Sequence, residues 1–317
     1  MRSSPIWQHK GKVLSEGEAP KTADKERDYQ IGSASYRARP LEPALYIVAT
    51  PIGNLGDMTL RGIETLAAAD IIACEDTRVS RVLLDRYGIS RRPYAYHEHN
   101  AEMAGPKLID ALLAGKSVAL VSDAGTPLIS DPGGRLVPEA KAAGIRVVPI
   151  PGASSVLAAL TASGLFKDSF YFAGFLSSKQ GQRRAKLEQL KTLDAALVFF
   201  ESPNRAAATL ADMVEIFGPE RQASLCRELT KTYETVVTLP LKDLAAEFDG
   251  EDRIRGEVVL VVGPPQEHEN VPRSDDDIDA LLRALVLEMA PAKAAGEASR
   301  MTGRPKGELY QRLLALK

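Results

Sequence analysis

Residues 118–134, V-A-L-V-S-D-A-G-T-P-L-I-S-D-P-G-G, join a short apolar run to a long turn that is rich in Gly, Pro, Ser and Asp. The apolar run is typical of a buried strand, and open α/β sheets bind their ligands in turns at the carboxyl ends of such strands. The turn lacks the Lys-Ser/Thr pair of a nucleotide P-loop and the G-x-G-x-x-G spacing of a dinucleotide site. It therefore favours a pocket for a polar or cationic small molecule, and the alternative interpretation is an ordinary strand-to-helix loop.

The chain on both sides of this stretch alternates between short apolar runs and helical patterns. Such alternation indicates βαβ units and a mainly parallel sheet, which we expect in a first domain over residues 44–152. The predicted strands are 44–49, 71–74, 93–96, 117–121 and 146–149, and the predicted helices are 58–68, 78–87 and 104–113. Asp57 is predicted to cap the first of these helices.

A second α/β domain is predicted over residues 153–265, where the pattern changes. Here β-branched runs follow one another without long helical crossovers, which indicates antiparallel pairs in a mixed sheet. The predicted strands are 170–172, 196–200, 222–226, 233–239 and 257–262, and the predicted helices are 153–163, 183–193 and 206–217. Residues 275–317 are predicted to form a helical extension, in which a helix starts at Ile278 and a helix-turn-helix-like pair follows over 291–317.

The composition is that of a globular protein with no strong charge of either sign. The 317 residues are 44% apolar, and 40 Lys and Arg oppose 42 Asp and Glu, so a nucleic-acid partner would need local basic patches. Cys74 and Cys226 have neither metal-ligand spacing nor a disulfide framework, which favours a reducing, cytoplasmic location. No apolar stretch is long enough to span a bilayer, and we expect no membrane contact. Residues 1–43 hold few large apolar side chains, and we expect a disordered extension there.

Seven phrases in order along the chain resemble the tetrapyrrole-methylase-like S-adenosylmethionine-dependent methyltransferases. They are L-Y-I-V-A-T-P-I-G-N-L-G-D (45–57), C-E-D-T-R (74–78), Y-H-E-H-N (96–100), S-D-A-G-T-P-L-I-S-D-P-G (122–133), P-G-A-S-S (151–155), F-E-S-P-N-R (200–205) and R-E-L-T-K (227–231). The resemblance implies a two-domain fold with S-adenosyl-L-methionine folded in the cleft between the domains. Within the family, the phrases are similar to the branch that methylates the ribose 2′-hydroxyl of a cytidine in the decoding region of 16S rRNA. The implied partners are therefore 16S rRNA or the small ribosomal subunit, and a second copy of the chain in a homodimer.

The resemblance also implies which residues hold the cofactor, because the turn after the fourth strand is central in this family. The implied contacts are Pro51, Ser122, Asp123, Ala124, Gly125, Thr126, Pro127, Ile129, Ser130, Ser154 and Ser155. Glycine permits close approach of the backbone, and hydroxyl or carbonyl oxygens suit the methionine head and a positive sulfonium. Thr126 stands where many tetrapyrrole methylases carry Asp, which argues against a porphyrinoid substrate.

Methyl transfer to a ribose hydroxyl calls for a base or hydrogen-bond acceptor, which would contribute about 10²-fold or more to the rate. The catalytic candidates are polar residues that follow apolar runs and can converge on one cleft: Asp76, Glu75, His97, Glu201 and Lys231. Asp76 can instead be a helix cap, and Glu201 can form a surface ion pair with Arg205. The residues alone leave the base unassigned.

Two basic segments offer local positive charge for an RNA partner. Residues 178–191 carry five Lys and Arg against one Glu, and residues 291–317 carry six against two. The predicted RNA contacts are Arg78, Asn100, Lys179, Arg183, Arg184, Arg205, Arg304 and Lys306. The alternative is that these charged helix faces are only solvated. Two other functions stay open: a tetrapyrrole (precorrin) C-methyltransferase, and a ligand-sensing regulator whose C-terminal helix pair binds nucleic acid.

Overall fold

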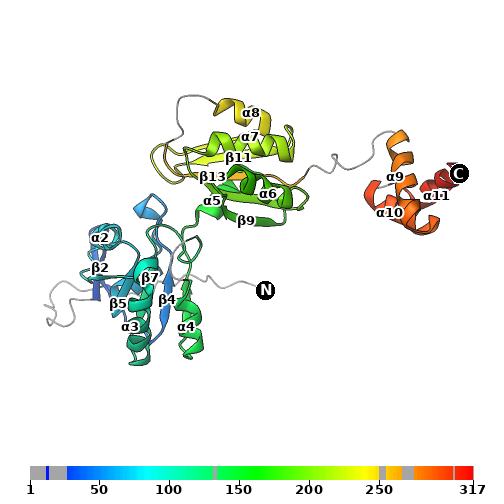
Figure 1. The fold of residues 1–317 in the computed structure, drawn as a ribbon. Coiled ribbons are helices and arrows are strands. Elements are labelled where there is room, and N and C mark those ends of the chain that lie inside the picture. Colours follow the sequence, from blue (N-terminus) through cyan, green and yellow to red (C-terminus); the bar gives the residue numbers. More distant parts are fainter. Residues whose placement is uncertain are drawn as a thin grey trace, which may run out of the picture. The chain divides into compact units, whose positions relative to one another are not determined.

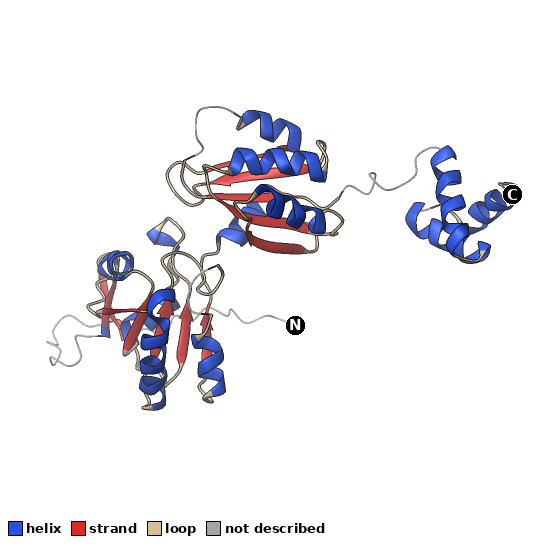
Figure 2. Ribbon diagram, in the orientation of Figure 1, coloured by secondary structure: helices blue, strands red, loops and turns tan. Residues whose placement is uncertain are grey.

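The computed structural model describes residues 12–13, 27–130, 134–249, 255–265, 275–302 and 304–316. The chain divides into two units. The larger unit holds both sheets of the predicted α/β domains, and the smaller contains residues 264–317 together with 191–194. Figure 1 follows the chain through its elements, and Figure 2 shows that helices flank both five-stranded sheets. The expected α/β class is confirmed.

The first five-stranded sheet is wholly parallel, with strand order β6-β5-β7-β4-β8. Its strands are β4 (Leu45–Val48), β5 (Ile71–Cys74), β6 (Pro93–Ala95), β7 (Val118–Val121) and β8 (Val147–Ile150). Its connections contain α1 (Leu60–Ala68), α2 (Thr77–Arg86), α3 (Ala101–Leu113), α4 (Leu136–Ala142) and the short 3-10 helices η2 (Leu55–Asp57) and η3 (Glu98–Asn100). Because the strands are parallel, the turns that follow them lie at one edge of the sheet.

Two apolar clusters cover the two faces of this sheet. Tyr46 and Val48 of β4 belong to the cluster that contains side chains of α1 and α2. Leu45 and Ile47 belong to the cluster that contains side chains of α3 and α4. This alternation is what the strand geometry requires. Every residue of β4 is buried, which explains why the sequence shows a continuous apolar run there.

The first long helix begins later than predicted. Asp57 lies in η2, and the side chain of Thr59 caps α1 by accepting a hydrogen bond from the N–H of Gly62 at 3.1 Å. The prediction that Asp57 is the cap is therefore wrong, because an additional short turn, which Asn54 caps, precedes the helix.

Residues 28–37 form a hairpin where the sequence predicted disorder. β2 (Asp28–Ile31) pairs with β3 (Ala34–Arg37), and β1 (Lys12–Val13) pairs with the other side of β3. The rings of Tyr29 and Tyr36 stack with centroids 5.5 Å apart, and Tyr29 is fully buried in the cluster with α1 and α2. The disorder prediction is wrong for this hairpin because two aromatic side chains supply the apolar surface that the composition underestimates. Residues 1–11 and 14–26 lie outside the described residues.

The second five-stranded sheet is mixed, as predicted, with strand order β12-β11-β13-β10-β9. Only β9 and β10 are parallel to each other among the described pairs of this sheet. The strands are β9 (Phe170–Phe175), β10 (Ala196–Glu201), β11 (Gln222–Arg227), β12 (Thr235–Pro240) and β13 (Val258–Val262). The helices are α5 (Ser155–Ser163), α6 (Gln180–Leu190), α7 (Ala206–Phe217) and α8 (Leu241–Glu247). One apolar cluster joins α5 to the sheet, and another joins α6, α7 and α8 to it.

The smaller unit contains three helices, α9 (Asp275–Glu288), α10 (Pro291–Thr302) and α11 (Lys306–Ala315). Leu282, Ala295 and Leu309 are fully buried and belong to the apolar cluster that the three helices share. The helix-turn-helix-like pair is as predicted, but α9 begins at Asp275 rather than at Ile278, so its acidic residues form the first helical turn. None of the helices in the described parts of the chain combines the length and apolar character that crossing a membrane requires.

The hairpin should contribute to the stability of the first sheet. Replacing fully buried Tyr29 with Ala is expected to lower the free energy of unfolding by about 3–5 kcal/mol. The hydroxyl of Tyr29 is buried and has no hydrogen-bond partner among the described residues, so Tyr29→Phe should leave stability unchanged or raise it. Urea denaturation followed by fluorescence measures both. Tyr233→Ala is the control, because Tyr233 is 76% exposed; equal effects of the two alanine variants would contradict the prediction.

Candidate active site

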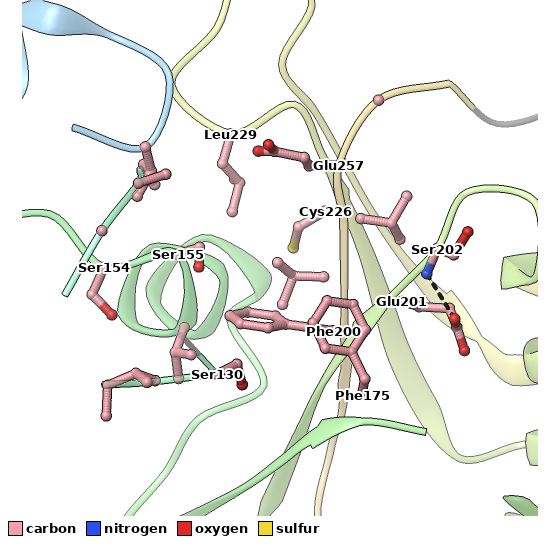
Figure 3. A pocket seen from close by; sticks show the side chains of 18 of the residues that line it. Ser130, Ser154, Ser155, Phe175, Phe200, Glu201, Ser202, Cys226, Leu229 and Glu257 are labelled. Carbon is pink, nitrogen blue, oxygen red and sulfur yellow. Dashed lines mark hydrogen bonds between the residues drawn. The ribbon is translucent and has the colours of Figure 1, made fainter. Parts of the chain in front are cut away.

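A pocket of about 390 Å³ opens between turns of the first sheet and the strands of the second (Figure 3). Its size is within the usual range of small-molecule sites. The turns after β4, β7 and β8 contribute Ile52, Ala124, Gly125, Thr126, Ile129, Ser130, Ser154, Ser155 and Val156. The second sheet and its turns contribute Phe175, Phe200, Glu201, Ser202, Pro203, Cys226, Leu229, Gly256, Glu257, Val258 and Val259. The pocket therefore uses the carboxyl edge of the parallel sheet, as the sequence predicted.

The turn after β7 is fixed to the turn after β4 by two backbone hydrogen bonds. The N–H of Thr50 donates to the carbonyl of Gly125 at 2.8 Å, and the N–H of Gly125 donates back to Thr50 at 3.0 Å. Gly125 has φ +78°, and a Cβ there would lie 3.3 Å from Cγ2 of Ile52, so the position favours glycine. The hydroxyl of Thr126 donates to the carbonyl of Ala153 at 3.3 Å and joins this turn to the start of α5.

Most of the predicted cofactor residues line this pocket. Those that do are Ala124, Gly125, Thr126, Ile129, Ser130, Ser154 and Ser155. Pro51, Ser122, Asp123 and Pro127 are not among the lining residues. The hydroxyl of Ser122 donates to the carbonyl of Ala124 at 3.3 Å, and a carboxylate oxygen of Asp123 accepts from the N–H of Asp76 at 3.0 Å. Ser122 and Asp123 therefore shape the turn instead of facing the space that it encloses.

Glu201 lines the pocket, but its carboxylate is already occupied. It accepts hydrogen bonds from the N–H of Ser202 and the hydroxyl of Thr209, both at 2.7 Å, and it pairs with Arg205 at 2.7 Å. Its side chain is 1% exposed, and Figure 3 shows the bond to Ser202. A buried carboxylate with three donors is poorly suited to take a proton from a substrate. We infer that Glu201 orients the turn after β10 and Arg205, which also donates to the carbonyl of Leu176 at 3.2 Å.

Asp76 is a helix cap. Its carboxylate accepts from the N–H of Arg78 at 2.8 Å and pairs with the Arg78 guanidinium at 2.6 Å. Hydrogen bonds from the Arg78 side chain and backbone lower the pKa of Asp76 to about 2, and a carboxylate with so low a pKa is a weak base. Neither Asp76 nor the half-buried Glu75 lines the pocket.

His97 and Asn100 belong to the turn after β6. The side-chain oxygen of Asn100 accepts from the N–H of His97, and its amide donates to the carbonyl of Ala95, both at 2.9 Å. Asn100 therefore holds the backbone of the turn. His97 is half-buried, its Nδ1 has no partner among the described residues, and it is not a lining residue of the pocket.

Lys231 does not line the pocket but reaches a residue that does. Its Nζ lies 2.9 Å from a carboxylate oxygen of Glu228 and 3.2 Å from one of Glu257. Burial lowers the pKa of Lys231, but the hydrogen bonds to the two glutamates outweigh this and raise it above the ordinary value. Lys231 is therefore a cation at neutral pH and not a base.

Three aromatic rings in and beside the pocket escaped the sequence prediction. The ring of Phe200 meets those of Phe172 and Phe175 edge to face, at centroid distances of 4.8 and 5.4 Å. Phe175 is 60% exposed and Phe200 half-buried. The available sequence signal is that Phe200 opens the F-E-S-P-N-R phrase at the end of a predicted strand. These rings offer flat apolar faces and edges to a ligand with an aromatic base.

Arg183, one of the predicted RNA contacts, lies buried in an ion pair. It is 5% exposed, and its guanidinium pairs with buried Asp212 of α7 at 2.6 Å, which also accepts from the amide of Gln180 at 3.1 Å. The pairing fixes α6 on α7. Arg184 pairs with Glu215 and so is partly neutralised. The charge excess of this segment is therefore smaller at the surface than in the sequence.

The remaining predicted RNA contacts differ in how freely they are exposed. Lys179 and Lys306 are exposed, and the side chain of Arg78 is 89% exposed although it pairs with Asp76. Arg304 pairs with Asp275 at 3.2 Å and with Glu308 at 3.3 Å. The acidic first turn of α9 therefore reduces the positive charge of the helix pair.

Comparison with known proteins places this arrangement in a family. The family profile of the Tetrapyrrole (Corrin/Porphyrin) Methylases matches residues 44–245, and that of the RsmI C-terminal HTH domain matches residues 272–317. The chain is similar to "Ribosomal RNA small subunit methyltransferase I" of Mesorhizobium japonicum, with 62% identity over 287 residues, which cover 90% of this chain and 97% of that protein.

Solved structures of lower identity share the fold. A cobalt precorrin-4 methyltransferase superposes with a TM-score of 0.54 at 19% identity, over 70% of this chain and 95% of that one. A uroporphyrin-III C-methyltransferase from Thermus thermophilus, complexed with S-adenyl homocysteine, gives a TM-score of 0.50 at 21% identity, over 69% and 97% of the two chains. The predicted two-domain tetrapyrrole methylase fold is confirmed.

The capping role of Asp76 can be tested by titration. Carboxyl-carbon NMR should give a midpoint near pH 2 for Asp76, and Arg78→Met should raise it toward the ordinary value near 3.8 because the largest stabilising hydrogen bond is lost. Arg81→Met is the matched control, because Arg81 pairs with Asp85 and not with Asp76. A midpoint that ignores Arg78→Met would show that Arg78 does not stabilise the charged cap.

Proposed function

The chain belongs to the ribosomal RNA small subunit methyltransferase I family within the tetrapyrrole methylases, and from this we propose that it methylates the ribose 2′-hydroxyl of a cytidine in the decoding region of 16S rRNA. It is an S-adenosylmethionine-dependent methyltransferase. The observation that carries the proposal is the 62% identity across 90% of the chain to a protein named as a ribosomal RNA small subunit methyltransferase.

The pocket residues fit S-adenosyl-L-methionine chemically. The cofactor supplies a methyl group on a positively charged sulfur. Thr126, Ser154 and Ser155 place hydroxyls at the pocket, and Gly125 leaves its backbone open to close approach. Phe175 and Phe200 add aromatic surface that suits an adenine ring. We propose that these residues hold the cofactor, with Pro51, Ser122, Asp123 and Pro127 supporting the turns around it.

Catalysis by this site should come mainly from orientation. Methyl transfer to a hydroxyl is an in-line displacement, so the ribose oxygen must be held on the far side of the methyl carbon from the sulfur. The rigid turns after β4 and β7, joined through Thr50 and Gly125, provide a fixed wall against which this alignment can be set.

The boundary between the two α/β domains is proposed near residues 152–153, where the chain passes from β8 to α5.

The proposed RNA contacts are exposed cations, some in the larger unit and one in the helical unit. Lys179, Lys306 and Arg78 are the candidates that the structure leaves most exposed. Binding through them should weaken with added salt, since each neutralised phosphate releases counterions. We propose that the assembled small ribosomal subunit or free 16S rRNA meets the protein through them in the cytoplasm.

A homodimer is also proposed. Its support is β9, one of the two outer strands of the second sheet as described, which exposes 42% of Phe170 and 38% of Tyr171. Exposed aromatics on an edge strand are unusual in a monomer. Light scattering on the purified protein would decide this point.

A tetrapyrrole substrate is the weaker candidate. The precorrin enzyme that shares the fold is 19% identical, whereas the rRNA methyltransferase is 62% identical.

Mapping of ribose methylation in 16S rRNA from cells that lack the protein tests the proposal that it methylates 16S rRNA. Loss of methylation at one decoding-region cytidine, restored by the purified protein with labelled cofactor, is the expected result. Unaltered rRNA methylation would refute it.

Cofactor affinity should depend on Gly125 because this residue lines the pocket, and not only because its backbone has a positive φ. Gly125→Ala and Gly115→Ala both place a methyl group at a positive φ, +78° and +83°, but only Gly125 lines the pocket. Calorimetry with S-adenosyl-L-methionine should show a dissociation constant that rises about tenfold, or about 1.4 kcal/mol, for Gly125→Ala. Gly115→Ala should bind normally. Equal binding by both variants would remove Gly125 from the cofactor site.

A further inference from the structure

The R-E-L-T-K turn that follows β11 holds two residues in a rare backbone conformation. Glu228 has φ +51° and Thr230 has φ +67°, and neither is glycine. Left-handed backbone at such residues is unfavourable and is found where the surrounding structure enforces it, often at functional sites. Leu229, between them, lines the pocket. The turn is therefore a place to look for a residue that acts on the substrate.

The turn builds a network of three charges that ends at the pocket. Glu228 accepts the N–H of Glu257 at 2.9 Å and the ammonium of Lys231 at 2.9 Å through the same oxygen. Lys231 also pairs with the other end of the network, the Glu257 carboxylate, at 3.2 Å. Glu257 lines the pocket together with Leu229, and both are labelled in Figure 3.

Two glycines make room for this network. A Cβ on Gly256 would lie 2.3 Å from the Glu228 carboxylate, and a Cβ on Gly53 would lie 2.5 Å from Cγ of Lys231. No side chain fits at either distance without displacement of a charged partner. The backbone on both sides thus fixes Lys231 and Glu228, which in turn fix Glu257.

Few residues of the pocket can accept a proton. Among the lining residues, the ionisable groups are Glu201, Cys226 and Glu257. Glu201 is occupied by three donors, as described above. Burial raises the pKa of the Cys226 thiol, which keeps it protonated. Glu257 differs from both because its side chain is 72% exposed.

We propose that Glu257 accepts the proton of the substrate hydroxyl, and that Lys231 is the positioning residue that holds its carboxylate. The inference rests on the proposed function, because it assigns a role within ribose methylation. As the ribose oxygen forms its bond to the methyl carbon, the O–H proton passes to the carboxylate of Glu257. The carbon–sulfur bond breaks with its electron pair on sulfur, which leaves as a neutral thioether. The proton is then released from the exposed carboxylate to water, so charge and atoms balance.

The test compares Glu257→Gln with the unchanged protein on small ribosomal subunits from cells that lack the enzyme. Glu257→Gln keeps a polar side chain of the same size but is no longer a base, so kcat should fall about 10²-fold. Binding of S-adenosyl-L-methionine, measured by calorimetry, should remain unchanged. Lys231→Met should also lower kcat more than it changes KM, and Lys231→Arg should restore much of the loss because it keeps the pairing with Glu257.

Glu220 and Lys242 form the matched control pair. Their charged atoms are 2.7 Å apart and both side chains are exposed, but neither residue lines the pocket. Glu220→Gln and Lys242→Met should therefore leave kcat as it is. A Glu257→Gln variant that transfers methyl at the normal rate would overturn the inference while the proposed function stands. A failure of the unchanged protein to methylate both the subunits and free 16S rRNA would defeat the proposed function, and the inference with it.

Discussion

The candidate site depends on the reciprocal pair of hydrogen bonds between Thr50 and Gly125. These two bonds form an isolated antiparallel bridge beyond the ends of the parallel strands β4 and β7, and they lock the two turns that follow those strands. The hydroxyl of Thr50 also donates to the carbonyl of Ser122 at 3.1 Å, so the start of the turn is fixed as well. Without this bridge, a turn so rich in Gly and Pro would sample many conformations. Ligand binding would then have to order the turn, and the lost conformational entropy would lower the affinity. With it, the wall of the pocket exists before any ligand arrives.

Much of the fold could be predicted from local pattern, and the reasons are physical. β4 and β7 are buried at every position, so they appear as uninterrupted apolar runs that few other structures produce. The hairpin at residues 28–37 was missed because its stability comes from Tyr29 packing against helices that follow later in the chain. Local composition gives the number of apolar residues in a segment. It does not show whether a distant part of the chain offers an apolar surface for them to pack against.

The site was predicted less completely than the fold, because chemistry depends on partners far apart in sequence. The glycine-rich turn was recognisable, since its residue types serve a purpose within the turn itself. In contrast, the sequence around Arg183 does not indicate that it forms a buried ion pair with Asp212. The sequence around Glu201 likewise does not indicate that its carboxylate accepts a hydrogen bond from Thr209. Glu257 is the opposite case. It follows a stretch with no distinctive motif, and only the pairing of β11 with β13 brings it to Glu228 and Lys231.

The two glutamates of the pocket show how environment divides roles between identical side chains. Glu201 is 1% exposed and its carboxylate is occupied by three donors, so a proton placed on it would break bonds that hold the turn. Glu257 is held through the cation of Lys231 but stays largely exposed. In the proposed reaction, a large RNA substrate would bring its ribose to the exposed side of the pocket, and a base that works repeatedly would lose its proton to solvent after each transfer. An exposed carboxylate in a fixed position meets both requirements, whereas a buried one meets neither. The same reasoning explains why the Glu257 carboxylate is held by an ion pair with Lys231 and is not buried. Burial would also hold the carboxylate in position, but it would hinder release of the proton to water.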